Sequence, residues 1–493
     1  MDPLIDPDPR ALREADFRQT IDSGFGDGWN HYAHSMAWFN GKLYVGTSRA
    51  PMAALRLSQP LPQMFPWPVQ APDDLYDIDR RAQIWQYTAE TQSWKRVFRS
   101  PVVTGTNKRT DVPSYIGLRG MAVYQDAGDA APCLYVTTWS PHTAHSPDLL
   151  RSEDGEHFAP VARPPFAPTV RAFRTLQPFQ NRVHISPTAS GSAKGFLQDI
   201  SSEAVIYANA DLRTPHWVAV SEEGFGNKAN ATVFEMGLFD GHLYGGTINS
   251  QSGCELWKTR GGDPPYTWTP VFKDGAGRGQ LNEAIAAMCE FKGALYVSMG
   301  IINGGYHRGA NIGPAAAEVI RVYPDDRWEL IVGHARATPE GMRYPLSGFG
   351  PGFDSLFNGY VWRMCVHDGY LYAGTLNWTN STPYMPINLW PEDALGLVRR
   401  WGDEALLAKL GGAELWRTAD GIHWEPVTRN GFGNKYNWGI RTLVSTPHGL
   451  FVGTANPYGP KVAVKRNGQW QYVYNARGGC EIWQGARGQM GSP

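Results

Sequence analysis

The chain has almost no net charge and no long apolar run. Its 493 residues include 45 Lys and Arg against 46 Asp and Glu, a formal net charge of −1. This balance gives no electrostatic reason to expect nucleic acid or an anionic membrane surface as a partner. Because no stretch approaches about eighteen consecutive apolar residues, the sequence predicts no membrane-spanning helix.

Cysteine is scarce, and a secretory signal is missing from the start of the chain. The opening "MDPLIDPDPRALREADF" has acidic residues and prolines where a signal peptide needs a basic start and an apolar run, so we expect a cytoplasmic protein. The cysteines have no CxxC spacing, which favours reduced thiols over a zinc site or a disulfide framework. They are Cys133, Cys254, Cys289, Cys365 and Cys480.

Glycine and aromatic residues are abundant, and the chain repeats itself. The 55 Gly, 19 Trp and 22 Tyr are typical of many short strands joined by tight turns. One recurring phrase is strand, turn, strand, as in "MAWFNGKLYVGT" at Met36 and "MGLFDGHLYGGT" at Met236. Its Asn-Gly or Asp-Gly supplies the positive backbone angles of a two-residue hairpin. A second phrase, "CELWKTRGGDPPYTWTPVF" at Cys254 and "AELWRTADGIHWEPV" at Ala413, predicts a third and a fourth strand.

Seven units of four antiparallel strands follow from this count. They predict an all-β fold, a seven-bladed β-propeller formed as a single domain by residues 1–493. The seventh unit lacks a fourth strand, whereas "FRQTIDSGFG" from Phe17 matches the fourth-strand phrase "WEPVTRNGFG" from Trp424. We therefore predict that the N-terminal strand pairs near Cys480 and completes the last blade. The first phrases begin at Met36, Met121, Leu176, Met236, Met288, Met364 and Leu443.

The repeat resembles that of bacterial propellers whose blades contain the motifs "F.G.LYVGT", "EIW" and "DG..W..V...GFG". This group includes the propeller domains of cyanobacterial enzymes that alkylate aromatic rings or carboxylates. The resemblance implies a propeller fold over nearly the whole chain. It implies no particular activity, and no catalytic residue is carried over from it.

Repetition separates scaffold from candidate site. A carboxylate recurs at one third-strand position in several units, so we assign Glu255, Glu318, Glu414 and Glu481 to structure. The asparagines of the "GFGN..N" phrase, Asn230, Asn282 and Asn437, are expected to bond backbone groups at a turn. Polar residues that break the repeat need another explanation.

When the first strands of the units are aligned, one column of equivalent positions does not follow the repeat. It lies two residues before the Met or Leu that begins each first phrase. The next column contains two charged exceptions, Glu235 and Arg363. We expect both columns to converge at the mouth of the central channel. The arginines either bond loop carbonyls and pair with Glu235 and Glu283, or bind an anionic ligand through their planar guanidinium groups. The first column is His34, Arg119, Arg174, Phe234, Ala286, Trp362 and Arg441.

Two long insertions, residues 48–81 and 376–412, follow second strands and are predicted to lie on the same face as the channel mouth. The second contains an expected amphipathic helix near 391–410. Apolar insertions over a polar channel are typical of lids over a small molecule. A helix at this place also fits a contact between two copies, so we expect a monomer or a homodimer.

These features favour a cofactor-independent enzyme acting on a small anionic or aromatic molecule by elimination, hydrolysis, cyclisation or alkyl transfer. A lyase, hydrolase or transferase fits, whereas a non-catalytic propeller that binds a protein, glycan or small ligand on the same face is the alternative. His142 and His145, with His31, His34 and His307, could bind a metal, but their spacing matches no established ligand motif, and no cofactor is predicted. The catalytic candidates are His34, Arg119, Arg441 and Glu235, and the substrate-binding candidates are Tyr32, Arg174, Tyr360, Trp362, Arg363, Trp438 and Asn377.

Overall fold

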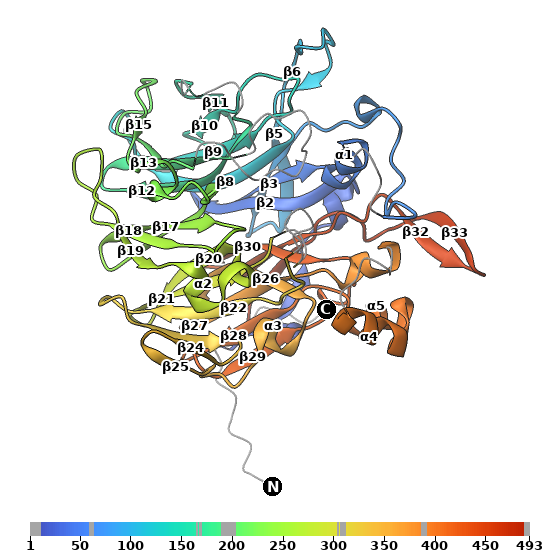
Figure 1. The fold of residues 1–493 in the computed structure, drawn as a ribbon. Coiled ribbons are helices and arrows are strands. Elements are labelled where there is room, and N and C mark those ends of the chain that lie inside the picture. Colours follow the sequence, from blue (N-terminus) through green and yellow to red (C-terminus); the bar gives the residue numbers. More distant parts are fainter. Residues whose placement is uncertain are drawn as a thin grey trace.

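The structure is a computed structural model that describes residues 11–58, 64–163, 166, 170–188, 204–302, 305, 312–385 and 392–487. Short antiparallel strands make up most of it, and the strands form small sheets arranged around a central axis (Figure 1). None of the described helices is long and apolar enough to cross a membrane.

The strands pair in antiparallel groups of four. In each group the first strand pairs with the second, the second with the third and the third with the fourth. The groups are β2–β5 (Asn30–Phe39, Lys42–Arg49, Gln83–Thr88, Ser93–Arg99), β8–β11 (Gly117–Tyr124, Cys133–Trp139, Leu149–Ser152, Ala159–Pro160), β12–β15 (Ala172–Phe179, Arg182–Thr188, Tyr207–Asn209, Val218–Ala219), β16–β19 (Thr232–Phe239, His242–Ile248, Leu256–Thr259, Thr269–Phe272), β20–β23 (Ala284–Phe291, Ala294–Gly300, Glu318–Val322, Trp328–Val332), β26–β29 (Asn358–His367, Tyr370–Asn377, Leu415–Thr418, Trp424–Thr428), and β30, β31, β34 and β1 (Gly439–Thr446, Gly449–Ala455, Ile482–Gly485, Phe17–Gln19).

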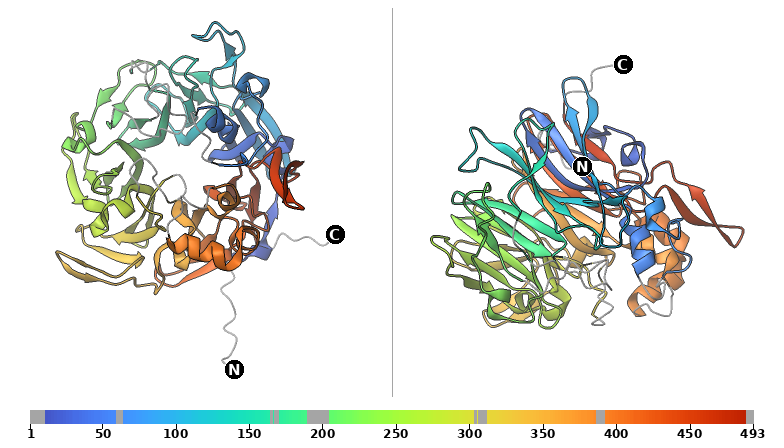
Figure 2. Two further views of the ribbon diagram at one scale, coloured as in Figure 1. Left: turned by 45° about the vertical axis from the view of Figure 1, so that its right-hand side comes forward. Right: turned by 90° about the horizontal axis from the view of Figure 1, so that it is seen from above.

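The first strands of these groups form a closed inner ring. Each contacts the next in the order β2, β8, β12, β16, β20, β26, β30 and back to β2. Bridges between a second strand and the following inner strand join the groups, and Tyr32 pairs with Ala455 where the last group meets the first. The views in Figure 2 show the sheets around this ring. The arrangement is a β-propeller, the fold class that the repeats predict.

The two ends of the chain meet in the last group. Strand β1 pairs antiparallel with β34, and Phe17 lies opposite Gly485. Beyond the strand, Thr20 N–H donates to the Ile482 carbonyl at 2.9 Å and Gly24 N–H to the Cys480 carbonyl at 2.7 Å. The predicted pairing of the N-terminal strand near Cys480 is confirmed by these contacts.

A strained turn precedes several inner strands and is held by stacking. Phe25, Phe225, Phe353 and Phe432 have φ near +55°, and each follows a glycine in the same left-handed region. This conformation costs a non-glycine residue about 1–2 kcal/mol. Each phenylalanine ring stacks on the Trp of its group's third strand, for example Phe353 on Trp416 with ring centroids 4.5 Å apart.

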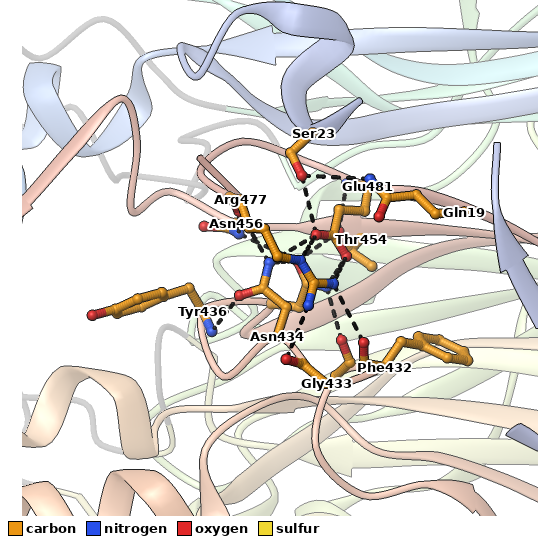
Figure 3. A network of polar contacts seen from close by, with 12 residues as sticks. Gln19, Ser23, Phe432, Gly433, Asn434, Tyr436, Thr454, Asn456, Arg477 and Glu481 are labelled. Carbon is orange, nitrogen blue, oxygen red and sulfur yellow. Dashed lines mark hydrogen bonds and ion pairs between the residues drawn. The ribbon is translucent and has the colours of Figure 1, made fainter. Parts of the chain in front are cut away.

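A buried Asn–Glu pair fastens the same turn. Asn437 Nδ2 donates to the Gly431 carbonyl at 2.9 Å and to Glu481 Oε2 at 2.7 Å. Arg477 Nε donates to Glu481 Oε1 at 2.9 Å, and Figure 3 shows Arg477 and Glu481 in this network. Asn230 and Glu255 repeat the arrangement. Asn282 with Glu318 and Asn358 with Glu414 do so as well. The structural assignment of these carboxylates is therefore confirmed.

Three insertions lie together at the start of the inner strands. They hold α1 (Pro51–Ser58), then η6 (Thr379–Tyr384) with α4 (Glu392–Trp401) and α5 (Asp403–Leu410), and the hairpin β32–β33 (Lys461–Arg466, Gln469–Tyr474). Phe65 N–H donates to the Tyr384 carbonyl at 2.8 Å, and Val69 bridges Val462. The hairpin β32–β33 is an insertion that the sequence pattern did not predict.

The prediction of a single helix near 391–410 is wrong in one respect. The segment contains two helices, α4 and α5, which are divided at Gly402, whose φ of 77° lies in the left-handed region. Of its apolar residues, Val398 is buried, whereas Trp401 is exposed. Pro391 lies outside the described residues.

The closure gives a first prediction. Phe17 is buried, and its ring lies 5.2 Å from that of Phe432, so Phe17→Ala should lower the free energy of unfolding by about 3–5 kcal/mol. Phe65→Ala, at a ring that is 80% exposed, is the matched control and should change it by less than about 0.5 kcal/mol. Urea denaturation measures both, and equal stabilities would show that β1 does not stabilise the ring.

Candidate functional site

Every inner strand contains an extra residue at a corresponding place, and β2 and β26 each contain a second one, His31 and Gly359, nearer their starts. In β2, Ala33 pairs with Thr47 and Ser35 with Gly46, so His34 is left unpaired in a β-bulge. In β12 the extra residue lies between Phe173 and Leu176. In the other inner strands it is Arg119, Phe234, Ala286, Trp362 or Arg441. The column that breaks the sequence repeat is thus a ring of bulged residues.

The ring of bulges surrounds a cavity of about 350 Å³ inside the channel. Consecutive residues such as His34 and Ser35, or Arg441 and Thr442, line it together, which a regular strand does not permit. The structure therefore brings together all four predicted catalytic candidates and two of the substrate-binding candidates. These lining residues are His34, Arg119, Arg174, Glu235, Arg363 and Arg441.

Positive charge exceeds negative charge in the cavity. Four arginines line it, and the carboxylates among its lining residues are Glu235 and the exposed Glu290. Glu235 Oε1 lies 3.8 Å from Arg363 Nη1. Within the described part of the chain, Nε and Nη1 of the buried Arg441 have no hydrogen-bond partner. Among the described residues that line the cavity, the carboxylates therefore leave a cationic excess.

The pKa of Arg441 reflects this environment. Burial lowers it well below its usual range, and the like charges of Arg363, Arg174 and Arg119 lower it further, while Glu235 raises it. Arginine keeps its charge in proteins. An added anion would therefore be favoured strongly here, since a low dielectric strengthens its attraction to the guanidinium groups.

His34 is a neutral imidazole in the same environment. Burial lowers its pKa well below the ordinary 6.5, and Arg441, Arg119, Arg174 and Arg363 lower it further in that order. Its Nδ1 is buried and lacks a hydrogen-bond partner among the described residues. A Cβ atom on residue 117 would lie 3.2 Å from this nitrogen. Glycine, which has no Cβ, therefore leaves the room that the imidazole needs.

Aromatic rings support the arginines. The Arg441 guanidinium carbon lies 5.2 Å from the Trp362 ring centroid, and that of Arg119 lies 5.1 Å from Trp139. Arg174 lies 3.2 Å from the Phe234 ring centroid, and its Nε donates to the Phe234 carbonyl at 2.8 Å. Such cation–π contacts orient a guanidinium group. Arg119 Nη1 also donates to Thr188 Oγ1 at 3.0 Å.

The aromatic candidates do not line the cavity. Trp362 and Tyr360 belong to a buried hydrophobic cluster, and Tyr32 and Trp438 pack against it. The Tyr32 ring lies 5.9 Å from Trp362 and 5.8 Å from His34. These residues stand behind the arginines and His34, where they support the cavity wall.

Asn377 belongs to the scaffold in this structure. Its Nδ2 donates to Asn358 Oδ1 at 3.0 Å, and its Oδ1 accepts from Thr379 N–H. Asn249 makes the equivalent contact to Asn230. Comparing the residue after each second strand would have shown this repetition in the sequence.

The insertions expected to form lids contribute nothing to the lining of this cavity, as far as the described residues go. Their role as lids stays a prediction. In the described part of the chain, no group of three or more His, Cys, Asp and Glu side chains is placed to hold a metal ion. His307 lies outside that part.

No protein-family profile matches the chain, and no curated protein sequence matches it. Among solved structures, the chain is similar to puromycin hydrolase (12% identity, TM-score 0.43, covering 94% of this chain and 56% of that one). It is also similar to Saccharomyces cerevisiae Sqt1 (10%, 0.41, 93% and 97%). A third likeness is to a structure from a study of two prolyl endopeptidases (10%, 0.40, 92% and 51%).

The chain thus spans about half the length of the puromycin hydrolase and prolyl endopeptidase chains. At such low TM-scores, these likenesses carry no conclusion about activity.

The buried histidines give a second prediction. Burial lowers the pKa of His31 to about 3, that of His184 to about 4 and that of His34 well below 6.5. The unfolded chain takes up protons below pH 6.5 that the folded chain excludes. Stability should therefore be full above pH 6.5 and fall below it, by up to about 1.4 kcal/mol per pH unit for each histidine.

Urea denaturation at pH 7.5, 6.5 and 5.5 measures this dependence. In His34→Gln, the free energy of unfolding should depend less steeply on pH, by the contribution of one histidine. The exposed His216→Gln is the control for the same chemical change. Equal slopes in the wild type and His34→Gln would contradict the burial of a neutral His34.

Proposed function

We propose that the chain is a seven-bladed propeller that acts as an enzyme on a small anionic substrate held in the channel cavity. The observation that carries the proposal is the excess of arginine over carboxylate around this cavity. Buried like charges repel one another unless an anion or a carboxylate offsets them. A substrate with two or more negative charges, on carboxylate or phosphate groups, would offset them best.

The chemistry follows from the roles available to the lining residues. Arg119, Arg174 and Arg441 bind the anion and stabilise negative charge that develops on it during the reaction. Burial and the arginine charges hold the pKa of His34 well below 6.5, so the imidazole is a weak base before the substrate binds. A bound anion would offset the arginine charges and raise this pKa, so His34 can accept a proton as a general base once the substrate is in place. Because Nδ1 is packed against Gly117, Nε2 is the nitrogen available for that transfer.

Glu235 has a different role. Its carboxylate lies beside Arg363 and also raises the pKa of Arg441, so it offsets part of the positive charge. Elimination, hydrolysis, cyclisation and alkyl transfer all develop negative charge that the remaining arginines would stabilise. No redox cofactor is needed for any of them.

Arg441→Met gives the third prediction. The variant should bind sulfate, phosphate or citrate at least about tenfold more weakly, because it loses hydrogen bonds to a charged group. Without any added anion, it should be more stable than the wild type by about 1–4 kcal/mol, because an apolar side chain replaces a buried guanidinium.

Calorimetric titration and urea denaturation measure the two effects. Arg400→Met, at an exposed position of α4, is the control and should change neither. Unchanged affinity in Arg441→Met for every probe that the wild type binds would exclude the arginine cluster as the anion site.

His34→Gln separates an enzyme from a binding protein. We expect the wild type to deplete one member of a pool of anionic metabolites, and His34→Gln to bind the probes yet turn over at least about 100-fold more slowly. Liquid chromatography with mass spectrometry follows the depletion. If the wild type binds its ligand and leaves the pool unchanged, the non-catalytic alternative is correct.

A further inference from the structure

The cavity extends along the inner strands towards their ends. Its deepest residues, His34 and Arg441, are 3% and 2% exposed, whereas Leu238 is 39% exposed and Glu290 is exposed. Leu238 and Glu290 each lie one residue before the end of an inner strand. The cavity therefore opens on the face of the ring where hairpin turns join the first strands to the second.

This is the face opposite the insertions. Thr232, at the start of β16, pairs with Ile248 at the end of β17, so the connection from second to third strand lies beside the beginning of the inner strand. Phe239, at the other end of β16, pairs with His242 across the hairpin turn. The three insertions connect second strands to third strands. The open end of the cavity lies among the hairpin turns that connect first strands to second strands.

Aromatic rings close the cavity at its other end. Phe234, Tyr360 and Trp362 are at most 8% exposed, and the rings of Tyr360 and Trp362 lie 5.5 Å apart. Tyr32 contacts both Trp362 and Trp438, so the packing continues across neighbouring groups. Phe234 and Trp362 belong to the ring of bulged residues, and Tyr360 and Tyr32 lie nearer the starts of their inner strands, on the side of the insertions.

We infer that the ligand reaches the arginines from the hairpin face, past Leu238 and Glu290, and not from beneath the insertions. The inference rests on the proposed function, because it concerns the same anion site. The anionic group enters first and lies deepest, against Arg441 and Arg119. The rest of the ligand points towards Leu238 and Val444, which also line the cavity.

Glu290 has a particular place on this route. Its exposed carboxylate stands at the entrance, so every entering anion passes a like charge before it meets the arginines. Such a charge slows association and favours ligands whose anionic group is compact and whose remainder is neutral or cationic. Glu290 and Leu238 are therefore specificity-determining residues of the entrance.

Charge reversal at each end of the channel tests the route. Glu290→Lys should accelerate association of phosphate, sulfate or citrate by at least about twofold at low salt, with the gain shrinking as salt rises. Glu404→Lys, an exposed position of α5 in the insertions, is the matched control and should leave the rate unchanged. Stopped-flow tryptophan fluorescence follows binding, since the Trp362 ring centroid lies 5.2 Å from the Arg441 guanidinium carbon.

A second variant tests the same route by size. Leu238→Trp narrows the entrance, so association and dissociation should both slow while the Kd changes by less than about twofold. Acceleration by Glu404→Lys alone, or unchanged rates in both Glu290→Lys and Leu238→Trp, would overturn the inference and leave the anion site standing. If no probe binds the wild type in a manner that depends on Arg441, the proposed function fails, and the inference with it.

Discussion

The β-bulge in each inner strand is the constraint on which the candidate site depends. A regular strand sends successive side chains to opposite faces, so half of an inner strand would face the neighbouring sheets. The extra residue interrupts this alternation, and His34 with Ser35, or Arg441 with Thr442, can line one cavity. Because every inner strand has the bulge at a corresponding place, the bulged residues form a circle. Phe234, Ala286 and Trp362 pack into a hydrophobic cluster, whereas His34, Arg119, Arg174 and Arg441 line the cavity.

Holding several arginines in this circle requires support from both sides. Trp362, Trp139 and Phe234 present their faces to the guanidinium groups, while the Asn–Glu pairs and Phe–Trp stacks fix the turns from which the inner strands start. The Asn–Glu pairs and Phe–Trp stacks recur from blade to blade, and Phe234 and Trp362 lie in a buried cluster, whereas arginine occupies only some of the bulged positions. A scaffold with so many buried contacts can tolerate a destabilising group at its centre, which is common where binding requires unpaired charge.

The sequence predicted the features that depend on repetition. Hairpin turns, the pairing of Phe17 with the last sheet and the structural role of Glu481 all follow from comparing one unit with another. The convergence of His34, Arg119 and Arg441 was predictable for the opposite reason, because these residues interrupt a repeat. Tyr32 and Trp362 were predicted to bind the substrate, whereas they pack outside the cavity lining. A sequence does not show on which side of the arginines an aromatic ring lies. The helix break at Gly402 and the packing of the hairpin at 461–474 against residues 65–70 depend on tertiary contacts that no local pattern encodes.

The joining of β1 to β34 also sets the order in which the molecule can be completed. Arg18 and Gln484, which hydrogen-bond across this junction, are 466 positions apart. At a synthesis rate of about 5–20 residues per second, the N-terminal strand waits roughly 25–90 s for its partner to be made. During that interval β1 has no strand to pair with, and the first group lacks its neighbour from the end of the chain. A chain that folds during synthesis would therefore pass through an open arc, whose unpaired edges can pair with another copy until the last strand emerges.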